Sequence, residues 1–182
     1  MNERNYDFRA RMREIHRPGR RNTQIQCQPG EIELEATWTL ALEGDFGVGG
    51  HKALADLQDY LWTSMGLSLR LAKAGTDAAP ALRLCQGAVD GPKGSFTLDI
   101  AESGIVLTAP GLPGLWSGIV YLEDTMNLRE APLLPLGRQE RRPLVRVRRA
   151  HSGCGIDDFP DWQLAAMAHA GFSAIDVFIK DF

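Results

Sequence analysis

The sequence of this 182-residue chain predicts an α+β fold followed by one strand–helix–strand unit. Three observations predict it. Several short segments alternate polar and apolar side chains, as half-buried strands do. Two longer segments repeat apolar residues at the 3.6-residue period of an amphipathic helix. After Pro143, a strand pattern, a helix pattern and a largely apolar strand pattern follow one another.

The composition is that of a globular protein. Hydrophobic residues make up 44% and charged residues 24% of the chain, which excludes disordered, collagen-like and disulfide-scaffold proteins. The longest apolar run is far shorter than the ~20 residues that span a bilayer, and no secretory signal pattern is present. We therefore expect a cytoplasmic protein without a membrane partner. Cys27, Cys85 and Cys154 show no Cys-x-x-Cys spacing and are expected to be buried free thiols.

Basic residues are concentrated in two blocks. Residues 1–21 and 129–149 hold seven arginines each, together fourteen of the twenty basic residues. Such blocks occur in nucleic-acid-binding proteins, but the second block has no interleaved aromatic residues and lies among prolines. We interpret it as a solvated linker that leads into a strand, and we expect no nucleic-acid partner. The first block predicts a short amphipathic helix that ends at Pro18-Gly19 and packs on the body or on another subunit; membrane attachment is the alternative.

The elements of the first 140 residues follow from local patterns. Residues 31–40 alternate as one strand, residues 44–50 are a glycine-rich loop, and Leu54 to Met65 form a helix that ends at Gly66. Two further strands are predicted on either side of a loop at residues 75–80. The remaining elements are a hairpin at residues 96–108 with its turn at Ser103-Gly104, and a second helix after Pro113-Gly114 that ends before Pro132.

The last forty residues predict a unit of a parallel sheet. Residues 145–150 read as a strand, residues 151–155 as a loop, and Asp158 as the N-cap of a helix that ends at Gly171. Residues 174–179 are largely apolar, as in a strand that is buried on both faces. Such a unit cannot close a sheet or bury both of its faces alone.

Several motifs fail the tests for specific chemistry. The glycines at residues 44–50 match neither Gly-x-Gly-x-x-Gly nor a P-loop, so a flexible turn is favoured over a nucleotide site. Cys154 near His151 is interpreted as a tight turn rather than a nucleophile with its base, and Ser117 misses the Gly-x-Ser-x-Gly elbow by one position. The four histidines show no metal-ligand spacing. We expect no metal and no cofactor.

One candidate site remains, and it is defined by position. In α/β barrels the residues at the carboxyl ends of the strands face the active site. If residues 145–182 begin a barrel, that rim carries five polar residues: Arg148, Arg149, His151, Lys180 and Asp181. Arginines there can bind sugar hydroxyls or carboxylates. Alternatively, these side chains merely solvate the strand ends.

The order of these elements resembles a known auxiliary module. Residues 94–109, residues 114–124, Leu133-Leu134-Pro135 and Pro143 give a strand, a Gly-Ile hairpin, a loop, a helix with glycines and leucine, and a proline linker. This order is similar to the non-catalytic α/β domain (domain 2) that precedes the barrel in glycoside hydrolase family 20 β-N-acetylhexosaminidases and in α-glucuronidases. The earlier helix, from Leu54 to Met65, and the strands around it fit the same layout, so the resemblance covers roughly residues 30–182.

The resemblance implies a mixed or antiparallel sheet with two helices on one face. It implies three parts: a basic arm at 1–22, the domain-2-like α/β domain at 23–138, and at 139–182 a linker with the first β-α-β unit of a truncated (β/α)8 barrel. The strand-1 arginine that grips the sugar in this family stands in Asp-x-x-Arg-His, for which Arg149 is the nearest match and Arg148 the next. Ala150 separates Arg149 from His151, and the aspartate is missing.

The family's second barrel strand ends His-x-His-Leu-x-Asp-Asp, of which only the first of the two aspartates is matched, by Asp181. These departures favour a divergent relative. The tentative substrate-binding residues are therefore Arg149, Arg148, His151 and Asp181. The family's catalytic Asp-Glu pair lies on strand 4, so we expect this chain alone to lack turnover.

We therefore expect the auxiliary portion of a carbohydrate-active protein whose partner is the carbohydrate substrate of the complete protein. The alternative is a stand-alone carbohydrate-binding or assembly module, in which a second copy or a partner chain covers the open strands at 145–150 and 174–179.

Overall fold

The computed structural model describes residues 14–73, 75, 80–151 and 159–177. The chain forms two compact units, of which the larger is His16–Leu144. The second contains the residues from Val145 onward.

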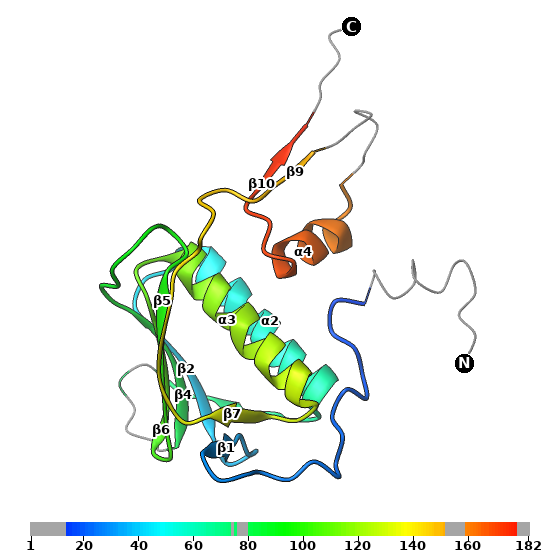
Figure 1. Ribbon diagram of the computed structural model, residues 1–182, viewed down its shortest axis with the longest axis vertical. Coiled ribbons are helices and arrows are strands. Elements are labelled where there is room, and N and C mark those ends of the chain that lie inside the picture. Colours follow the sequence, from blue (N-terminus) through cyan, green and yellow to red (C-terminus); the bar gives the residue numbers. More distant parts are fainter. Residues whose placement is uncertain (1–13, 74, 76–79, 152–158, 178–182) are drawn as a thin grey trace, which may run out of the picture. The chain divides into compact units, whose positions relative to one another are not determined.

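The larger unit is built on a six-stranded mixed sheet in the order β3-β2-β4-β6-β5-β8 (Figure 1). Its strands are β2 (Thr39–Glu43), β3 (Arg70–Leu71), β4 (Ala81–Gln86), β5 (Phe96–Ala101), β6 (Gly104–Ala109) and β8 (Gly137–Arg141). β2 pairs parallel with β3 and β4, and β4 pairs parallel with β6. β5 pairs antiparallel with β6 and with β8. A separate antiparallel pair joins β1 (Glu31–Glu33) to β7 (Leu133–Pro135).

Two helices, α2 (Gly47–Met65) and α3 (Leu112–Arg129), lie side by side on one face of this sheet (Figure 1). Their apolar stripes meet the inward side chains of the strands in one hydrophobic core, which includes Leu57, Leu61, Leu115, Ile119, Leu84, Leu98 and Leu107. Burying such side chains is the main driving force for this arrangement. The predicted α+β class, with a mixed sheet and two helices on one face, is confirmed.

Two glycines allow α3 to approach the sheet closely. Gly114 and Gly118 are four residues apart and therefore lie on one face of the helix. A Cβ at Gly114 would overlap the carbonyl oxygen of Ser95, and one at Gly118 would overlap the side chain of Leu107. Because Gly114 and Gly118 have no side chains, α3 lies closer to strands β5 and β6 than larger residues at these positions would permit.

The chain before β1 crosses the ends of both helices. The backbone N–H of Arg21 donates to the carbonyl of Ser64 at 3.2 Å, and that of Asn22 donates to the carbonyl of Glu130 at 2.7 Å. These bonds satisfy carbonyls that a helix end leaves without an intrahelical partner. The predicted helix of the basic arm falls largely on residues 1–13, outside the described residues.

Several predicted element boundaries are wrong. Residues 31–40 form two strands, because a turn from Glu35 to Trp38, closed by a 3.0 Å hydrogen bond, separates β1 from β2. Residues 47–50, expected in a loop, form the first turn of α2. There Gly49 packs so closely on Leu112 of α3 that a Cβ would overlap the Leu112 side chain. Tertiary packing thus overrides the low helix propensity of glycine.

The segment expected as a solvated linker contains an edge strand. β8 (Gly137–Arg141) pairs with β5, and Arg138 Nη1 lies 2.9 Å from Asp99 Oδ2 across that pair. Charged residues are common on exposed edge strands. The arginine-rich sequence of β8 therefore did not show the polar–apolar alternation from which strands are predicted.

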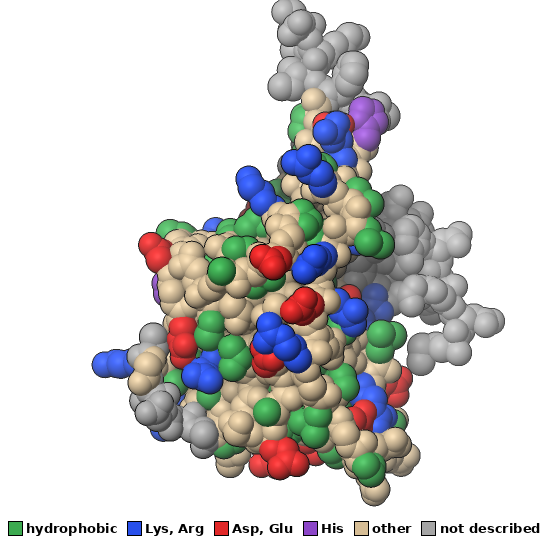
Figure 2. Space-filling model, turned by 60° about the vertical axis from the view of Figure 1, so that its left-hand side comes forward, with side chains coloured by type: hydrophobic (Ala, Val, Ile, Leu, Met, Phe, Trp, Pro, Cys, Tyr) green, Lys and Arg blue, Asp and Glu red, His purple; other side chains and the backbone are tan. Residues whose placement is uncertain are grey.

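On the face of the molecule in view in Figure 2, basic and acidic side chains are interspersed.

The prediction of buried thiols is wrong for Cys27, which is exposed, and Cys85 is only half-buried. Cys85 Sγ donates to Glu43 Oε2 at 3.3 Å. Burial first, and then the hydrogen bond and negative charge of Glu43, raise the pKa of the Cys85 thiol to about 11. Cys154 lies outside the described residues.

The second unit contains β9 (Arg149–His151), α4 (Asp161–His169) and β10 (Ala174–Asp176). β9 and β10 pair in parallel, as the strand–helix–strand pattern predicts. β9 begins only at Arg149, four residues later than predicted, and residues 178 and 179 of the second predicted strand lie outside the described residues. α4 follows the N-cap residue Pro160, while the predicted N-cap Asp158 lies outside the described residues. Within the described ranges, no helix is both long and apolar enough to span a bilayer.

Candidate functional site

Of the predicted rim residues, Arg148 directly precedes β9, Arg149 is its first residue and His151 is its last. Because the two strands are parallel, their carboxyl ends meet at one edge of the pair. The register pairs Arg149 with Ala174 and His151 with Asp176. Side chains two residues apart on a strand share a face, so Arg149, His151 and Asp176 project from the same side.

Arg149 and Asp176 are in direct contact. Arg149 Nη1 lies 3.2 Å from Asp176 Oδ2, and both side chains are about half exposed, at 57% and 46%. An exposed pair of this kind contributes little to stability. Because both groups already face water, either group can leave the other and bind a ligand more readily than a group in a buried ion pair can. His151 is also exposed.

Arg148 lies in different surroundings from Arg149. Its backbone N–H donates to Ser173 Oγ at 3.1 Å, and the carbonyl of Arg148 accepts from the backbone N–H groups of Ser173 and Ala174. Its guanidinium lies against Gly171, where a Cβ would meet Nη1. The structure therefore brings together Arg149 and His151 of the predicted set, and it places Arg148 beside the turn after α4. Asp181 and Lys180 lie outside the described residues.

Asp176 joins this group although it was not predicted as a site residue. The sequence contained one signal for it. Successive side chains of a strand point to opposite faces, so Asp176 lies on the face opposite the apolar Ile175. Together, a guanidinium, an imidazole and a carboxylate at this edge can bind hydroxyl or carboxylate groups of a ligand. In the part of the chain that the structure describes, the edge does not present the two opposed carboxyl groups that glycoside hydrolysis uses.

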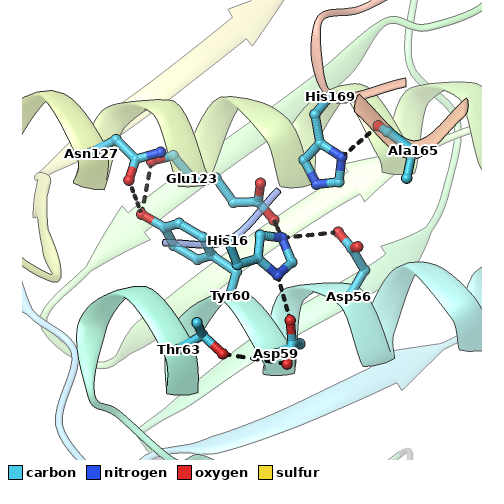
Figure 3. Close-up of polar contacts among 9 residues, drawn as sticks. All are labelled: His16, Asp56, Asp59, Tyr60, Thr63, Glu123, Asn127, Ala165 and His169. Atoms are coloured by element: carbon cyan, nitrogen blue, oxygen red, sulfur yellow. Dashed lines mark hydrogen bonds and ion pairs between the residues drawn. The ribbon is translucent and has the colours of Figure 1, made fainter. Parts of the chain in front are cut away.

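A second polar group lies between α2 and α3 in the larger unit (Figure 3). We call it the His16 cluster, and it consists of His16, Asp56, Asp59 and Glu123. His16 Nδ1 lies 2.7 Å from Asp59 Oδ2. His16 Nε2 lies 3.7 Å from Asp56 Oδ2 and 3.9 Å from Glu123 Oε1. The side chains of His16 and Glu123 are only 5% and 4% exposed.

Tyr60 forms one wall of this cluster. Its ring meets the imidazole of His16 edge to face, with the ring centres 5.6 Å apart. Its hydroxyl donates to the carbonyl oxygen of Glu123 or to Asn127 Oδ1, both at 3.0 Å. Burial, and next the charge of Glu123, raise the pKa of the Tyr60 phenol far above its usual value. The phenol is therefore a neutral hydrogen-bond donor here.

Sequence reasoning missed the His16 cluster because its members come from three distant segments. The histidines have no metal-ligand spacing along the chain. Two signals were available: Asp56 and Asp59 are three residues apart and so share a helix face, and Glu123 interrupts the apolar stripe of α3 next to Leu122. Neither signal points to His16, which only the fold brings to the helices.

No family model and no curated protein matches this sequence. Solved structures do match. A β-N-acetylhexosaminidase of glycoside hydrolase family 20 from Streptomyces coelicolor A3(2) gives a TM-score of 0.55 at 18% identity, over 69% of this chain and 26% of its own. An exo-β-N-acetylglucosaminidase of the same family from Vibrio harveyi gives 0.60 at 13% identity, over 82% and 23%. A glycoside hydrolase of family 138 that targets pectin rhamnogalacturonan II gives 0.51 at 16% identity, over 63% and 13%.

At these identities the comparisons establish the fold. The chain spans about a quarter of the length of the hexosaminidases that it matches. The predicted likeness to family 20 is confirmed at that level: this chain has a fold like part of a glycoside hydrolase family 20 β-N-acetylhexosaminidase.

Proposed function

We propose that the chain is the non-catalytic, auxiliary part of a glycoside-hydrolase-like protein, together with the start of its barrel. His16–Leu144 is then the domain-2-like module, and β9, α4 and β10 are the first strand, helix and second strand of the (β/α)8 barrel. The complete protein would act on a carbohydrate. The observation that carries the proposal is the order of the parts: a mixed sheet with two helices on one face, then a parallel β-α-β unit.

The extent of the structural likeness supports this division. His16–Leu144 holds 129 of the 182 residues, about 71%. The Streptomyces coelicolor enzyme matches 69% of the chain, which is close to the size of that unit. The Vibrio harveyi enzyme matches 82%, so its likeness extends beyond the unit. Enzymes of two families with different substrates share the fold, which favours a supporting role for the module over a role in substrate choice.

For the complete protein, β-N-acetylhexosaminides are the substrate class that we propose, because the matched enzymes carry that activity in their names. Arg149, the first residue of β9, then takes the place of the arginine that grips the sugar. Its guanidinium carries several N–H donors in a fixed plane, which suits adjacent sugar hydroxyls. Its contact with Asp176 would orient it before a sugar arrives.

Two measurements test the proposal. The purified chain should not release the chromophore from an aryl N-acetyl-β-glucosaminide, because two carboxyl groups must flank the scissile bond. Turnover that Arg149→Ala abolishes and Leu128→Ala leaves unchanged would overturn it. An experimental structure is the second test. With the sheet unit superposed on a family 20 enzyme, β9 and β10 should fall on barrel strands 1 and 2, and a different position contradicts the barrel assignment.

A stand-alone assembly module is the second candidate. It is favoured by the two-stranded parallel pair β9–β10, whose helix α4 has no buried residue. Open strand edges pair readily with other chains. Light scattering separates the candidates: a defined dimer supports assembly through these strands, and a monomer at all concentrations argues against it.

A further inference from the structure

We propose that His16, Asp56 and Glu123 form a binding site for a divalent transition-metal ion, with Zn²⁺ as the best match, and that Asp59 orients the imidazole. The site lies within the larger unit, between α2 and α3. It uses one ligand atom from each of three segments that are far apart in the sequence (Figure 3).

The distances suit ligands that share a metal ion better than partners in hydrogen bonds. His16 Nε2 is 3.7 Å from Asp56 Oδ2 and 3.9 Å from Glu123 Oε1, beyond the range of about 2.7–3.2 Å for N–H···O bonds. Ligand atoms that each lie about 2.0–2.2 Å from Zn²⁺ in a tetrahedron are separated by roughly 3.3–3.6 Å. The two distances from His16 Nε2 exceed this separation by only a few tenths of an ångström, and all the ligand atoms lie within 4.8 Å of one another.

The second nitrogen of the imidazole is held by a carboxylate. His16 Nδ1 lies 2.7 Å from Asp59 Oδ2, a hydrogen-bond distance. With the proton on Nδ1, the lone pair of Nε2 is directed toward Asp56 and Glu123. Metal-binding histidines almost always donate their other N–H to a carboxylate, carbonyl or water. The edge of the Tyr60 ring fixes the imidazole plane from another side.

Charge and burial also favour a cation at this place. Three carboxylates, those of Asp56, Asp59 and Glu123, lie around one imidazole. Glu123 is 4% exposed and Asp56 is 23% exposed, so water screens these charges poorly. Carboxylates in such surroundings attract a cation more strongly than exposed carboxylates do. A dication placed between Asp56 and Glu123 would interact with both.

The donor set indicates the class of metal. One imidazole nitrogen and two carboxylate oxygens are ligands that Zn²⁺ accepts, with water in the fourth position. Ca²⁺ takes six to eight oxygen ligands and Mg²⁺ an octahedron of oxygens and water, which this site does not provide from described residues. A metal ion here would fasten the segment before β1 to both helices, a structural role. It would raise the stability of the folded unit in proportion to its affinity.

Zinc and cobalt titrations of the untagged full chain test the site. Isothermal calorimetry should show one Zn²⁺ per chain, and the melting temperature should rise with Zn²⁺ and fall back with a chelator. His16→Gln should weaken Zn²⁺ affinity by more than about 100-fold, and Asp59→Asn by about tenfold to 100-fold. His51→Gln is the matched control, because His51 is an exposed histidine on the same helix as Asp56, α2, and its affinity should equal that of the wild type.

Two outcomes overturn the proposal. One is that wild type binds no Zn²⁺ at one per chain, or binds it as tightly after His16→Gln. The other is a thiolate charge-transfer band in the Co²⁺ complex, which would assign binding to one of the three cysteines, Cys27, Cys85 or Cys154. The buried positions are checked by circular dichroism. If His16→Gln or Glu123→Gln does not fold, Asp59→Asn decides, because the Asp59 side chain is 63% exposed and its replacement leaves the core unchanged. Unaltered affinity in Asp59→Asn then contradicts the site.

Discussion

Arg129, the last residue of α3, forms a bidentate salt bridge with Glu31 of β1. Arg129 Nε lies 2.7 Å from Glu31 Oε1 and Nη2 lies 3.0 Å from Oε2. Nη2 also donates to the carbonyl of Gln26 at 3.1 Å. The hydrogen bonds from Arg129, and next the backbone N–H of Gln28, lower the pKa of the Glu31 carboxyl below its usual value. The contact joins the end of α3 to the small sheet.

This contact predicts a pH-dependent contribution to stability. Because the pKa of Glu31 is lower in the folded chain, the contribution is present above about pH 4.5 and is lost as the pH falls below that value. At pH 7, Glu31→Gln should lower the free energy of unfolding by at most about 1 kcal/mol, since both groups are partly exposed. Urea unfolding of wild type and Glu31→Gln at pH 7, 5 and 3.5 measures this contribution. The difference in unfolding free energy between the two should be smallest at pH 3.5, and a difference that does not change with pH would contradict a stabilising role of the ionised Glu31 carboxylate. Glu102→Gln, in the exposed β5–β6 turn, is the control.

At the scale of the element, α3 depends on small residues as much as on its apolar stripe. Gly114 and Gly118 face β5 and β6, and both positions are buried. Alanine is normally favoured over glycine within a helix by about 1 kcal/mol. The close approach to Ser95 and Leu107 reverses that preference here, because an added methyl group has no room.

We therefore expect Gly118→Ala to destabilise the chain by about 1–3 kcal/mol. Gly114→Ala should cost at least as much, because its obstacle is a backbone carbonyl, whereas a leucine side chain can rotate away. Leu128→Ala on the same helix is the control; Leu128 is 88% exposed, and its replacement should change stability by less than about 0.5 kcal/mol. Urea unfolding at neutral pH measures all three. Alanine variants as stable as wild type would show that α3 does not approach the sheet so closely.

At the scale of the whole molecule, the two units differ in how much core they possess. His16–Leu144 contains the hydrophobic core that both helices and the sheet share. In the other unit, α4 has no buried residue. A unit with its own core can fold alone, whereas a single β-α-β unit lacks the layers that bury a parallel pair.

A fragment of residues 16–144 should therefore melt cooperatively, within a few degrees of the main transition of the full chain. A fragment of residues 145–182 should show no cooperative transition. Circular dichroism and amide exchange by nuclear magnetic resonance measure both. An unfolded 16–144 fragment would show that the larger unit requires the rest of the chain.

The sequence by itself determined the local elements of this protein and their order. The apolar periods of α2 and α3 and the alternation of β5 and β6 predicted these elements correctly, because period and turn residues act between near neighbours. The same order carried the likeness to family 20. Of the candidate site, the sequence predicted Arg149 and His151 at the carboxyl end of one strand; the structure has His151 as the last residue of β9 and Arg149 as its first.

Only the tertiary structure decided the rest. The edge strand β8 has a charged sequence, and its pairing depends on β5, about forty residues earlier. The separation of Arg148 from Arg149 depends on Gly171 and Ser173, which follow another helix. The His16 cluster requires three distant segments to meet. Such placements follow from packing between elements, and packing energy depends on which surfaces fit together, a property that no window of the sequence contains.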